Sequence, residues 1–204
     1  MNWPPFFALN VNPLGLLPLA WEIEVDALSS GPDVQILTAA ASPGSTVPGR
    51  WRFSVVTGDR IRESLGWLWQ LYHGRFRNFA SESFGTTLYP ANRLDATTTL
   101  NILEGRGAGN DWHRDANPVS GLFFATSLEP DEGGELQFRS SDGRFCEIRP
   151  RAGVFVCFDG SCEHQVAPLQ TPTRRLSFPM TYYASAQVQP FANENNRYEF
   201  QASY

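Results

Sequence analysis

Two of the three histidines in this chain stand beside residues that could complete a metal site. His113 lies two positions before Asp115, and His164 follows much later in the sequence. On an extended strand, residues two positions apart project from the same face, so His113 and Asp115 can act on one ion. Two histidines and one carboxylate hold non-haem iron on one side and leave the opposite positions open. The spacing therefore predicts iron-dependent oxygen chemistry.

A potential anion-binding pair follows the second histidine. Arg175 and Ser177 point the same way on a predicted strand, whereas Arg174 points to the other face and is expected to be exposed. A guanidinium fork binds a carboxylate through two hydrogen bonds, and a hydroxyl adds another. The pair therefore predicts a carboxylate pocket near the metal.

The segments between these residues are typical of strands and turns that would position them. Residues 122–128 form an apolar run, and residues 133–138 begin with two glycines that suit a turn into a strand. Residues 150–153 precede a second apolar run at 154–158. Short apolar runs bounded by glycine and proline indicate β-strands.

The first hundred residues are divided by prolines and glycines into short elements. Residues 61–78 repeat apolar side chains near the helical period, which predicts a helix with Asp59 as its N-cap. The aromatic residues of this helix are expected to pack in the core, and His73 is expected near the helix end. Residues 39–49 are the best loop candidate.

Together these features resemble the Fe(II)/2-oxoglutarate-dependent dioxygenases, particularly the small branch similar to prolyl 4-hydroxylases. The resemblance covers a little under half the chain, from about Thr97 to Tyr183. Each motif is weak by itself, and their order makes them specific. The motifs are the Asn101 strand, His113-x-Asp115, residues 122–128, Glu132-Gly133-Gly134-Glu135-Leu136, Gly153 before its strand, His164-x-Val166-x-Pro168 and Arg175-x-Ser177.

The resemblance implies a mostly β fold with flanking α-helices. Its core is a double-stranded β-helix, a jelly-roll or cupin-like pair of facing sheets, with amino-terminal helices buttressing one sheet. We expect one domain over residues 1–204. Its parts would be helices and buttressing strands at about 1–95, the catalytic core at about 96–184 and a tail at 185–204.

The same resemblance implies the cofactors and their ligands. His113, Asp115 and His164 would bind Fe(II), and Arg175 would fix the far carboxylate of 2-oxoglutarate, while O₂ takes the remaining position. Oxidation of 2-oxoglutarate to succinate and CO₂ would drive oxidation of a C–H bond. Hydroxylation is the expected outcome, with desaturation or cyclisation as alternatives. The residues expected around the cosubstrate are Arg175, Ser177, Ser127 and Val166.

Two positions depart from the family pattern, and a third distinguishes this chain from a related family. Leu103 and Ser127 stand where relatives often carry tyrosines, so part of the cosubstrate pocket must be built from other groups. Related halogenases carry a small residue where this chain has Asp115, which disfavours halogenation.

We expect a small-molecule substrate, either a free amino acid or another metabolite of a biosynthetic pathway. A free amino acid would need a cation for its carboxylate, and Arg93 or Arg114 could supply it. One alternative is a peptidyl-prolyl or protein hydroxylase. Another is a non-enzymatic cupin-like metal-binding or sensor protein, which would not need Arg175. The candidate substrate residues are Arg93, Thr99, Asn101, Leu103, Trp112, Arg114, Phe123 and Ala125.

Composition restricts the partners and the compartment. The net charge is −5, all sixteen basic residues are scattered arginines, and the absence of lysine excludes Schiff-base chemistry. No basic track for nucleic acid is evident.

Three cysteines without Cys-x-x-Cys spacing indicate neither disulfides nor zinc, and favour the reducing cytoplasm. Residues 1–20 lack the features of a signal peptide or membrane span. No feature indicates a particular oligomeric state.

Overall fold

The computed structural model describes residues 3–12, 17–37, 52–93 and 97–189. The loop predicted at residues 39–49 lies outside them. The helical elements are α1 (Leu19–Ser29), α2 (Gly58–Ser64), α3 (Gly66–Leu71), the π-helical η1 (Tyr72–Phe76) and α4 (Arg77–Phe84). The strands are β1 (Phe6–Asn10), β2 (Gln35–Leu37), β3 (Arg52–Val56), β4 (Tyr89–Pro90), β5 (Leu100–Glu104), β6 (Asn110–His113), β7 (Val119–Phe124), β8 (Leu136–Arg139), β9 (Phe145–Ile148), β10 (Val154–Asp159), β11 (Glu163–Val166) and β12 (Arg174–Tyr183).

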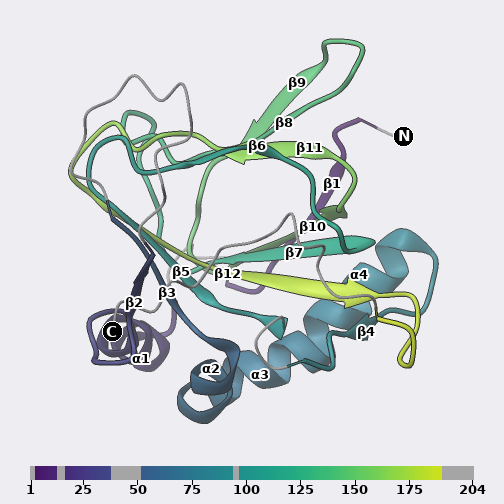
Figure 1. The fold of residues 1–204 in the computed structure, drawn as a ribbon, viewed down its shortest axis with the longest axis horizontal. Helices are drawn as coiled ribbons and strands as arrows, with labels where there is room; N and C mark the ends of the chain where they lie inside the picture. The colour runs from purple at the N-terminus through teal and green to yellow at the C-terminus, as the bar shows by residue number, and fades with distance from the viewer. Residues whose placement is uncertain (1–2, 13–16, 38–51, 94–96, 190–204) are drawn as a thin grey trace.

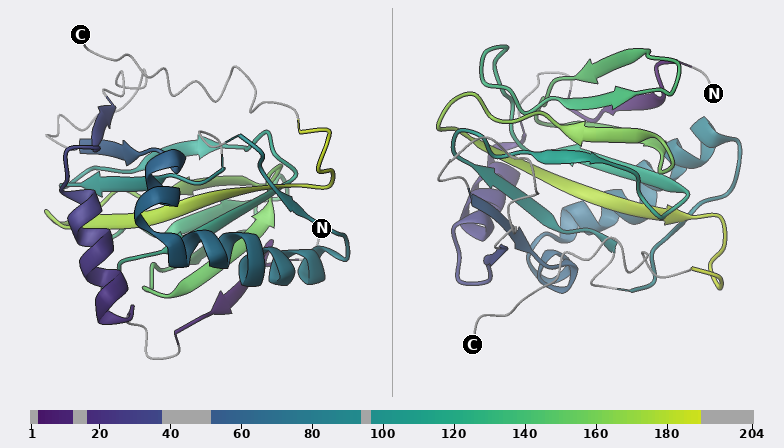
Figure 2. Two further views of the ribbon diagram at one scale, coloured as in Figure 1. Left: turned by 90° about the horizontal axis from the view of Figure 1, so that it is seen from below. Right: turned by 45° about the horizontal axis from the view of Figure 1, so that its top comes forward.

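The strands form two facing antiparallel sheets. The larger sheet has the order β1-β10-β7-β12-β5-β3-β2, with β4 paired to β12, and the smaller has the order β6-β11-β8-β9. The smaller sheet covers one face of the larger, and the helices α2 to α4 lie along the opposite face (Figures 1 and 2). The predicted β-helix fold with buttressing helices is confirmed.

The central strands of the larger sheet are apolar because both of their faces are covered. Every residue of β7 is buried, as are the first five of β10. On the helix side, the Phe76 ring stacks on Phe155 with centroids 4.3 Å apart, and Phe123 lies 5.2 Å from Phe76. Strands covered on both faces lose the polar alternation that would reveal which residues face which layer.

The predicted helix at residues 61–78 is longer than expected and is interrupted. It begins at α2, breaks at Leu65, where φ is −121° and ψ is 64°, and resumes as α3, η1 and α4. It ends at Gly85, which adopts the left-handed conformation with φ of 62°. Asp59 lies inside the first turn and accepts a hydrogen bond from the Thr57 hydroxyl, so the prediction that Asp59 is the N-cap was wrong.

Trp67, Tyr72 and Phe76 of this helical segment pack in the core, as predicted, whereas Trp69 is half-buried and lies outside the core clusters. Trp67 stacks on Trp21 of α1 with centroids 4.1 Å apart, and Tyr72 is fully buried. His73 lies within η1, beside the Trp69 ring at 4.5 Å, so its predicted helix-end position was wrong. Burial lowers the pKa of His73.

The three cysteines are unpaired. Cys157 and Cys162 are buried, whereas Cys146 is only partly buried. Burial raises the pKa of the Cys157 thiol to about 12, which keeps it protonated and unreactive. Cysteine here acts as a small apolar side chain.

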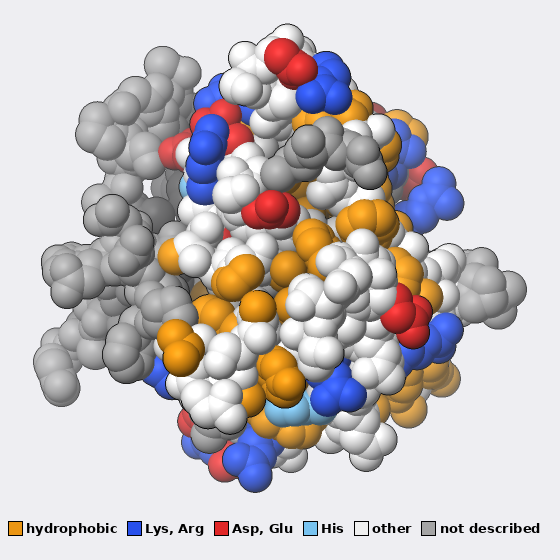
Figure 3. All heavy atoms as spheres, turned by 90° about the vertical axis from the view of Figure 1, so that its right-hand side faces the viewer, with side chains coloured by type: hydrophobic (Ala, Val, Ile, Leu, Met, Phe, Trp, Pro, Cys, Tyr) orange, Lys and Arg blue, Asp and Glu red, His pale blue; other side chains and the backbone are white. Residues whose placement is uncertain are grey.

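One end of the molecule combines an apolar centre with a charged edge. In Figure 3, apolar side chains gather in the middle of this face, and arginines and acidic residues are spread around them. Both signs of charge occur along that edge, which is typical of a solvated rim. Across the described ranges, no helix combines the length and the apolar character needed to cross a membrane.

Candidate metal and cosubstrate site

The two site histidines lie on neighbouring strands of the smaller sheet. β6 pairs with β11 so that His113 stands opposite His164, and their ring centroids are 4.2 Å apart. His164 is buried and packs against Phe158 at 4.7 Å, whereas His113 is partly exposed. Burial lowers the pKa of His164, which favours the neutral imidazole that can ligate a metal.

Asp115 is positioned by a loop, because β6 already ends at His113. Its backbone N–H donates to the carbonyl of Gly160 at 2.8 Å, and its carboxylate accepts a hydrogen bond from the Ser120 hydroxyl. Asn117 donates to that hydroxyl at 2.8 Å. Only glycine fits at residue 160, since a Cβ there would lie 1.9 Å from the Asn117 carbonyl oxygen. The prediction that strand alternation places Asp115 was therefore incomplete.

The ring nitrogens of the histidines are divided between two tasks. Nδ1 of His113 lies 2.7 Å from the Asp111 carbonyl, and Nδ1 of His164 lies 2.9 Å from the Cys162 carbonyl. An Nδ1–H that donates to a carbonyl leaves the Nε2 lone pair available. Both Nε2 atoms lie 3.7 Å from carboxylate oxygens of Asp115, and the three potential ligand atoms lie within 4.8 Å of one another. This donor set fits a non-haem iron ion.

Arg175 of β12 is 1% exposed and is held at two of its three nitrogens. Nε donates to the Gly134 carbonyl and Nη1 donates to the Ser177 hydroxyl, each at 2.8 Å. Nη2 is buried without a hydrogen-bond partner. Burial lowers the pKa of Arg175 to about 10, against an opposing effect of Glu135, so the group remains a cation at neutral pH. A buried cationic donor without a partner suits an anionic ligand.

Arg174 leaves the opposite face of β12, as strand alternation predicts. It is not exposed, however, because α1 covers that face. Its Nη2 donates to the Ser29 hydroxyl at 2.9 Å, and its Nη1 lies 3.5 Å from the Asp26 carboxylate. The expectation of an exposed Arg174 was wrong because the sequence did not show where α1 packs.

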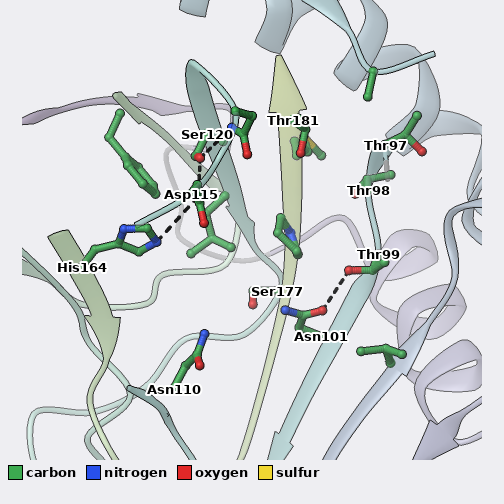
Figure 4. Close-up of a pocket in the computed structure, with 18 of the residues that line it drawn as sticks. Thr97, Thr98, Thr99, Asn101, Asn110, Asp115, Ser120, His164, Ser177 and Thr181 are labelled. Atoms are coloured by element: carbon green, nitrogen blue, oxygen red, sulfur yellow. Dashed lines mark hydrogen bonds and ion pairs between the residues drawn. The ribbon is translucent and has the colours of Figure 1, made fainter. Parts of the chain in front are cut away.

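The triad and Arg175 share one cavity of about 360 Å³. His164 and Asp115 lie on one side of it, and a group of threonines lies on the other (Figure 4). Ser177 lies between these groups in the same view. The arrangement places three potential metal ligands, a buried cation and further polar lining in one chamber.

A comparison with protein families gives this chamber a chemical context. The model of the 2OG-Fe(II) oxygenase superfamily matches residues 98–183, which include the triad, Arg175 and the strands from β5 to β12. Residues 98–183 belong to the 2OG-Fe(II) oxygenase superfamily. The chain is therefore an oxidoreductase that uses iron and 2-oxoglutarate, which sets aside the cupin-like sensor alternative.

Solved structures share the fold of this oxygenase at low sequence identity. A 2OG-Fe(II) oxygenase family oxidoreductase from Burkholderia pseudomallei is 16% identical, with 89% of this chain and 86% of that chain covered and a TM-score of 0.67. The epimerase SnoN of nogalamycin biosynthesis is 15% identical, with coverages of 88% and 76% and a TM-score of 0.64. A Pseudomonas putida prolyl-4-hydroxylase is 18% identical, with coverages of 89% and 93% and a TM-score of 0.53. None of the curated proteins matches the sequence.

About half of the remaining predicted site residues line the cavity of the oxygenase. Those that line it are Arg93, Thr99, Asn101, Leu103, Val166 and Ser177. Those outside the lining are Trp112, Arg114, Phe123, Ala125 and Ser127.

The misplaced residues have separate physical explanations. Phe123 and Ala125 face the helices, while Ser120 and Leu122 of the same segment line the cavity. Ser127 is exposed, and its hydroxyl accepts the backbone N–H of Ala152. The register chosen for β7 was therefore wrong by one residue, and the strand ends before Ser127.

The remaining two residues, Trp112 and Arg114, lie outside the cavity although they flank His113 in the sequence. Trp112 lies beneath the guanidinium of Arg139, with 4.3 Å from the guanidinium carbon to the ring centroid. Arg114 is exposed in the segment between His113 and Asp115. Neither side chain therefore lines the cavity, although both residues are next to His113 in the sequence.

Several lining residues were not predicted, although strand alternation could have found some of them. The series from Ser177 along β12 continues through Pro179 and Thr181 to Tyr183. Asn110, at the start of β6, and Asn117, in the loop after it, carry no comparable sequence signal. The unpredicted polar lining residues are Asn92, Thr97, Thr98, Asn110, Asn117, Ser120, Thr181, Tyr183 and Gln189.

Proposed function

We propose that this oxygenase holds iron with His113, Asp115 and His164 and holds the far carboxylate of 2-oxoglutarate with Arg175 and Ser177. The observation that carries the proposal is the buried Arg175 Nη2 without a hydrogen-bond partner, in the same cavity as the triad. Native proteins leave few buried donors unsatisfied. A ligand carboxylate would complete this one through a charge-assisted bond.

The chain's own residues prepare the metal ligands before any substrate arrives. The carbonyl of Asp111 fixes the His113 ring, and the Ser120 hydroxyl fixes one oxygen of the Asp115 carboxylate. Such bonds hold a ligand in its binding orientation and reduce the reorganisation needed on metal binding. Bound together, iron, 2-oxoglutarate and O₂ supply an oxidant for an unactivated C–H bond while yielding succinate and CO₂.

The cosubstrate end of the cavity has an apolar wall. Leu103 pairs in register with Arg175 across β5 and β12, and it packs with Phe53 and Val55. Because Leu103 offers no hydrogen bond, we assign the polar contacts to the far carboxylate of 2-oxoglutarate to Arg175 and Ser177. The exposed position of Ser127 makes it a poor replacement for the family's tyrosine.

The oxidised substrate is a small molecule, and hydroxylation is the proposed outcome. A cavity of about 360 Å³ lies within the usual range for small-molecule sites, about 300–1,000 Å³. The fold neighbours named above include both an epimerase and a prolyl-4-hydroxylase, so this architecture accommodates more than one reaction. Helices α1 to α4 share the core of the larger sheet, which supports one domain over residues 1–204.

Succinate formation from 2-oxoglutarate, measured with and without Fe(II), tests this function. His113→Ala, Asp115→Ala and His164→Ala should each abolish turnover and weaken binding of a probe metal such as Ni²⁺ in calorimetry. Their unfolding transitions should stay close to that of the wild type, because catalytic metal sites contribute less to folding than structural ones. Iron-dependent succinate formation by His164→Ala would refute the ligand assignment.

A further inference from the structure

One wall of the cavity is rich in uncharged hydrogen-bonding groups. The segment that leads into β5 carries three consecutive threonines, and Asn101 follows on the strand. In Figure 4, Thr97, Thr98 and Thr99 lie across the cavity from His164, and Thr181 of β12 lies near them. All of these residues line the cavity. This set, Thr97 to Thr99 with Asn101 and Thr181, is called the threonine wall below.

The hydroxyl of Thr98 on this wall lacks a hydrogen-bond partner within the protein. Its side chain is 2% exposed, and its Oγ1 atom is buried without a hydrogen bond. A buried hydroxyl in a native structure normally finds a partner, and an orphan at a cavity surface marks a place where a ligand group can bind. A hydroxyl both donates and accepts, so Thr98 can bind a ligand hydroxyl or ether oxygen.

Asn101 adds a donor with a fixed direction. The Thr99 hydroxyl donates to the Asn101 carbonyl oxygen at 2.8 Å. That bond fixes which end of the amide faces Thr99, and the amide nitrogen lies on the other side, toward Ser177 (Figure 4). The wall therefore offers the amide N–H₂ of Asn101 and the hydroxyl of Thr98 to one ligand.

Charge argues against an ionic substrate on this wall. Among the described lining residues, Asp115 is the one carboxylate, and we assign it to the metal. The ammonium of a free amino acid would find no carboxylate to pair with. Apart from the histidines and Arg175, the one cation lining the described cavity is Arg93, and it is exposed. The buried polar groups that this wall offers to a substrate are therefore uncharged.

The same chamber also provides apolar contact surface. Met180 and Tyr183 of β12 are buried and line it together with Pro179 and Leu122. A molecule with hydroxyls on its edges and C–H bonds on its faces matches this mixture of groups. We propose that the cavity binds a neutral, hydroxyl-rich ring compound, such as a sugar or cyclitol derivative, against the threonine wall. This inference rests on the proposed function and names its substrate class.

Ligand binding to the metal-free protein tests the inference independently of catalysis. Saturation-transfer NMR would be recorded with neutral methyl glycosides, disaccharides and myo-inositol, and separately with free amino acids including proline. At least one neutral polyol should bind, and Thr98→Val should weaken that binding by at least about fivefold. Preferential binding of amino acids, or no polyol binding, would overturn the inference.

Two control variants separate recognition from folding. Thr171 also has a buried, unpartnered Oγ1, but it does not line the cavity, so Thr171→Val should leave polyol binding unchanged. Arg93→Gln should also leave it unchanged, whereas an anionic substrate would lose affinity. Thr98→Val should unfold at the same or a higher temperature than wild type, because no protein hydrogen bond is lost. A lower unfolding temperature together with unchanged binding would assign Thr98 to folding and overturn its recognition role.

Failure of the inference and failure of the proposed function give different results. Polyol binding by a protein that never converts 2-oxoglutarate would leave the substrate class intact and remove the oxygenase role of the site. Iron-dependent succinate formation that is stimulated by amino acids and not by polyols would keep the oxygenase role and overturn the substrate class.

Discussion

On β12, Leu176, Phe178 and Tyr182 belong to the core that faces the helices, whereas Arg175 and Ser177 face the cavity. The one polar side-chain atom among these three helix-facing residues, the Tyr182 hydroxyl, donates to the Tyr72 carbonyl at 3.2 Å. The cavity-facing side includes a buried guanidinium with one unpartnered nitrogen. One strand therefore contributes stability through one face and ligand binding through the other.

Burial alone therefore does not identify a core residue. Arg175 and Phe178 are both about fully buried, at 1% and 0% exposure. What separates them is whether their neighbours satisfy their chemistry. Substitutions on the two faces should therefore change different measured quantities.

The largest expected effect is a loss of stability caused by a substitution on the helix-facing side of β12. Phe178→Ala should lower the free energy of unfolding by about 3–5 kcal/mol, because it removes a buried ring and leaves a cavity. The 2-oxoglutarate KM of the folded fraction should change little. Urea denaturation and initial-rate kinetics measure the two quantities. A large rise in KM with unchanged stability would erase the distinction between the faces.

The next largest effect is a higher KM for 2-oxoglutarate, caused by a substitution on the cavity-facing side of β12. Arg175→Ala should raise the 2-oxoglutarate KM by at least about tenfold, since a lost charge-assisted pair is worth on the order of 1.5–3 kcal/mol. Arg174→Ala should leave KM nearly unchanged, because that side chain contacts Ser29 and Asp26 of α1. Arg175→Lys should restore only part of the affinity, because an ammonium lacks the planar fork. The reverse ranking of the two arginines would move the cosubstrate site.

A smaller effect is expected where the smaller and larger sheets meet at the triad. Ser120 of β7 donates to the Asp115 carboxylate and accepts from Asn117. Ser120→Ala should weaken metal binding by about tenfold, the usual order for loss of a bond that orients a ligand. Calorimetry with Ni²⁺ measures the affinity, and Ser127→Ala is the control, because its side chain lies outside the cavity lining. Equal metal affinity in wild type and Ser120→Ala would remove the positioning role.

The smallest effect concerns proton uptake on the helix side. Burial, reinforced by Arg77 and Arg62, lowers the pKa of His73 in the folded protein, so the unfolded chain binds its proton more readily. The free energy of unfolding should therefore fall as pH drops below the unfolded pKa of about 6.5. His73→Gln should flatten this dependence between pH 7 and pH 5. An identical slope in both proteins would show that His73 does not contribute to it.

The sequence predicted the parts of the site that strand alternation controls. Arg175 and Ser177 were assigned to one face because β12 alternates an arginine and a serine with apolar residues. β7 is buried on both faces, so its apolar sequence could not show that Ser120 and Leu122, rather than Phe123, face the cavity.

Other features depend on packing between distant segments. The break at Leu65 and the cover that α1 gives Arg174 follow from tertiary contacts that no local pattern contains. The loop that places Asp115 depends on the close approach of Gly160 to Asn117. The His-x-Asp motif predicted that His113 and Asp115 would lie together, which they do, but not how the chain would hold Asp115.

We propose that one cavity binds both iron, through the triad, and 2-oxoglutarate, through Arg175. Anaerobic titration of the Fe(II)-loaded protein with 2-oxoglutarate tests it through the weak visible charge-transfer band of the chelate. The band should appear in the wild type, require at least about tenfold more 2-oxoglutarate in Arg175→Ala and be absent in His164→Ala. No band in the wild type, or the same titration curve for wild type and Arg175→Ala, would contradict this account.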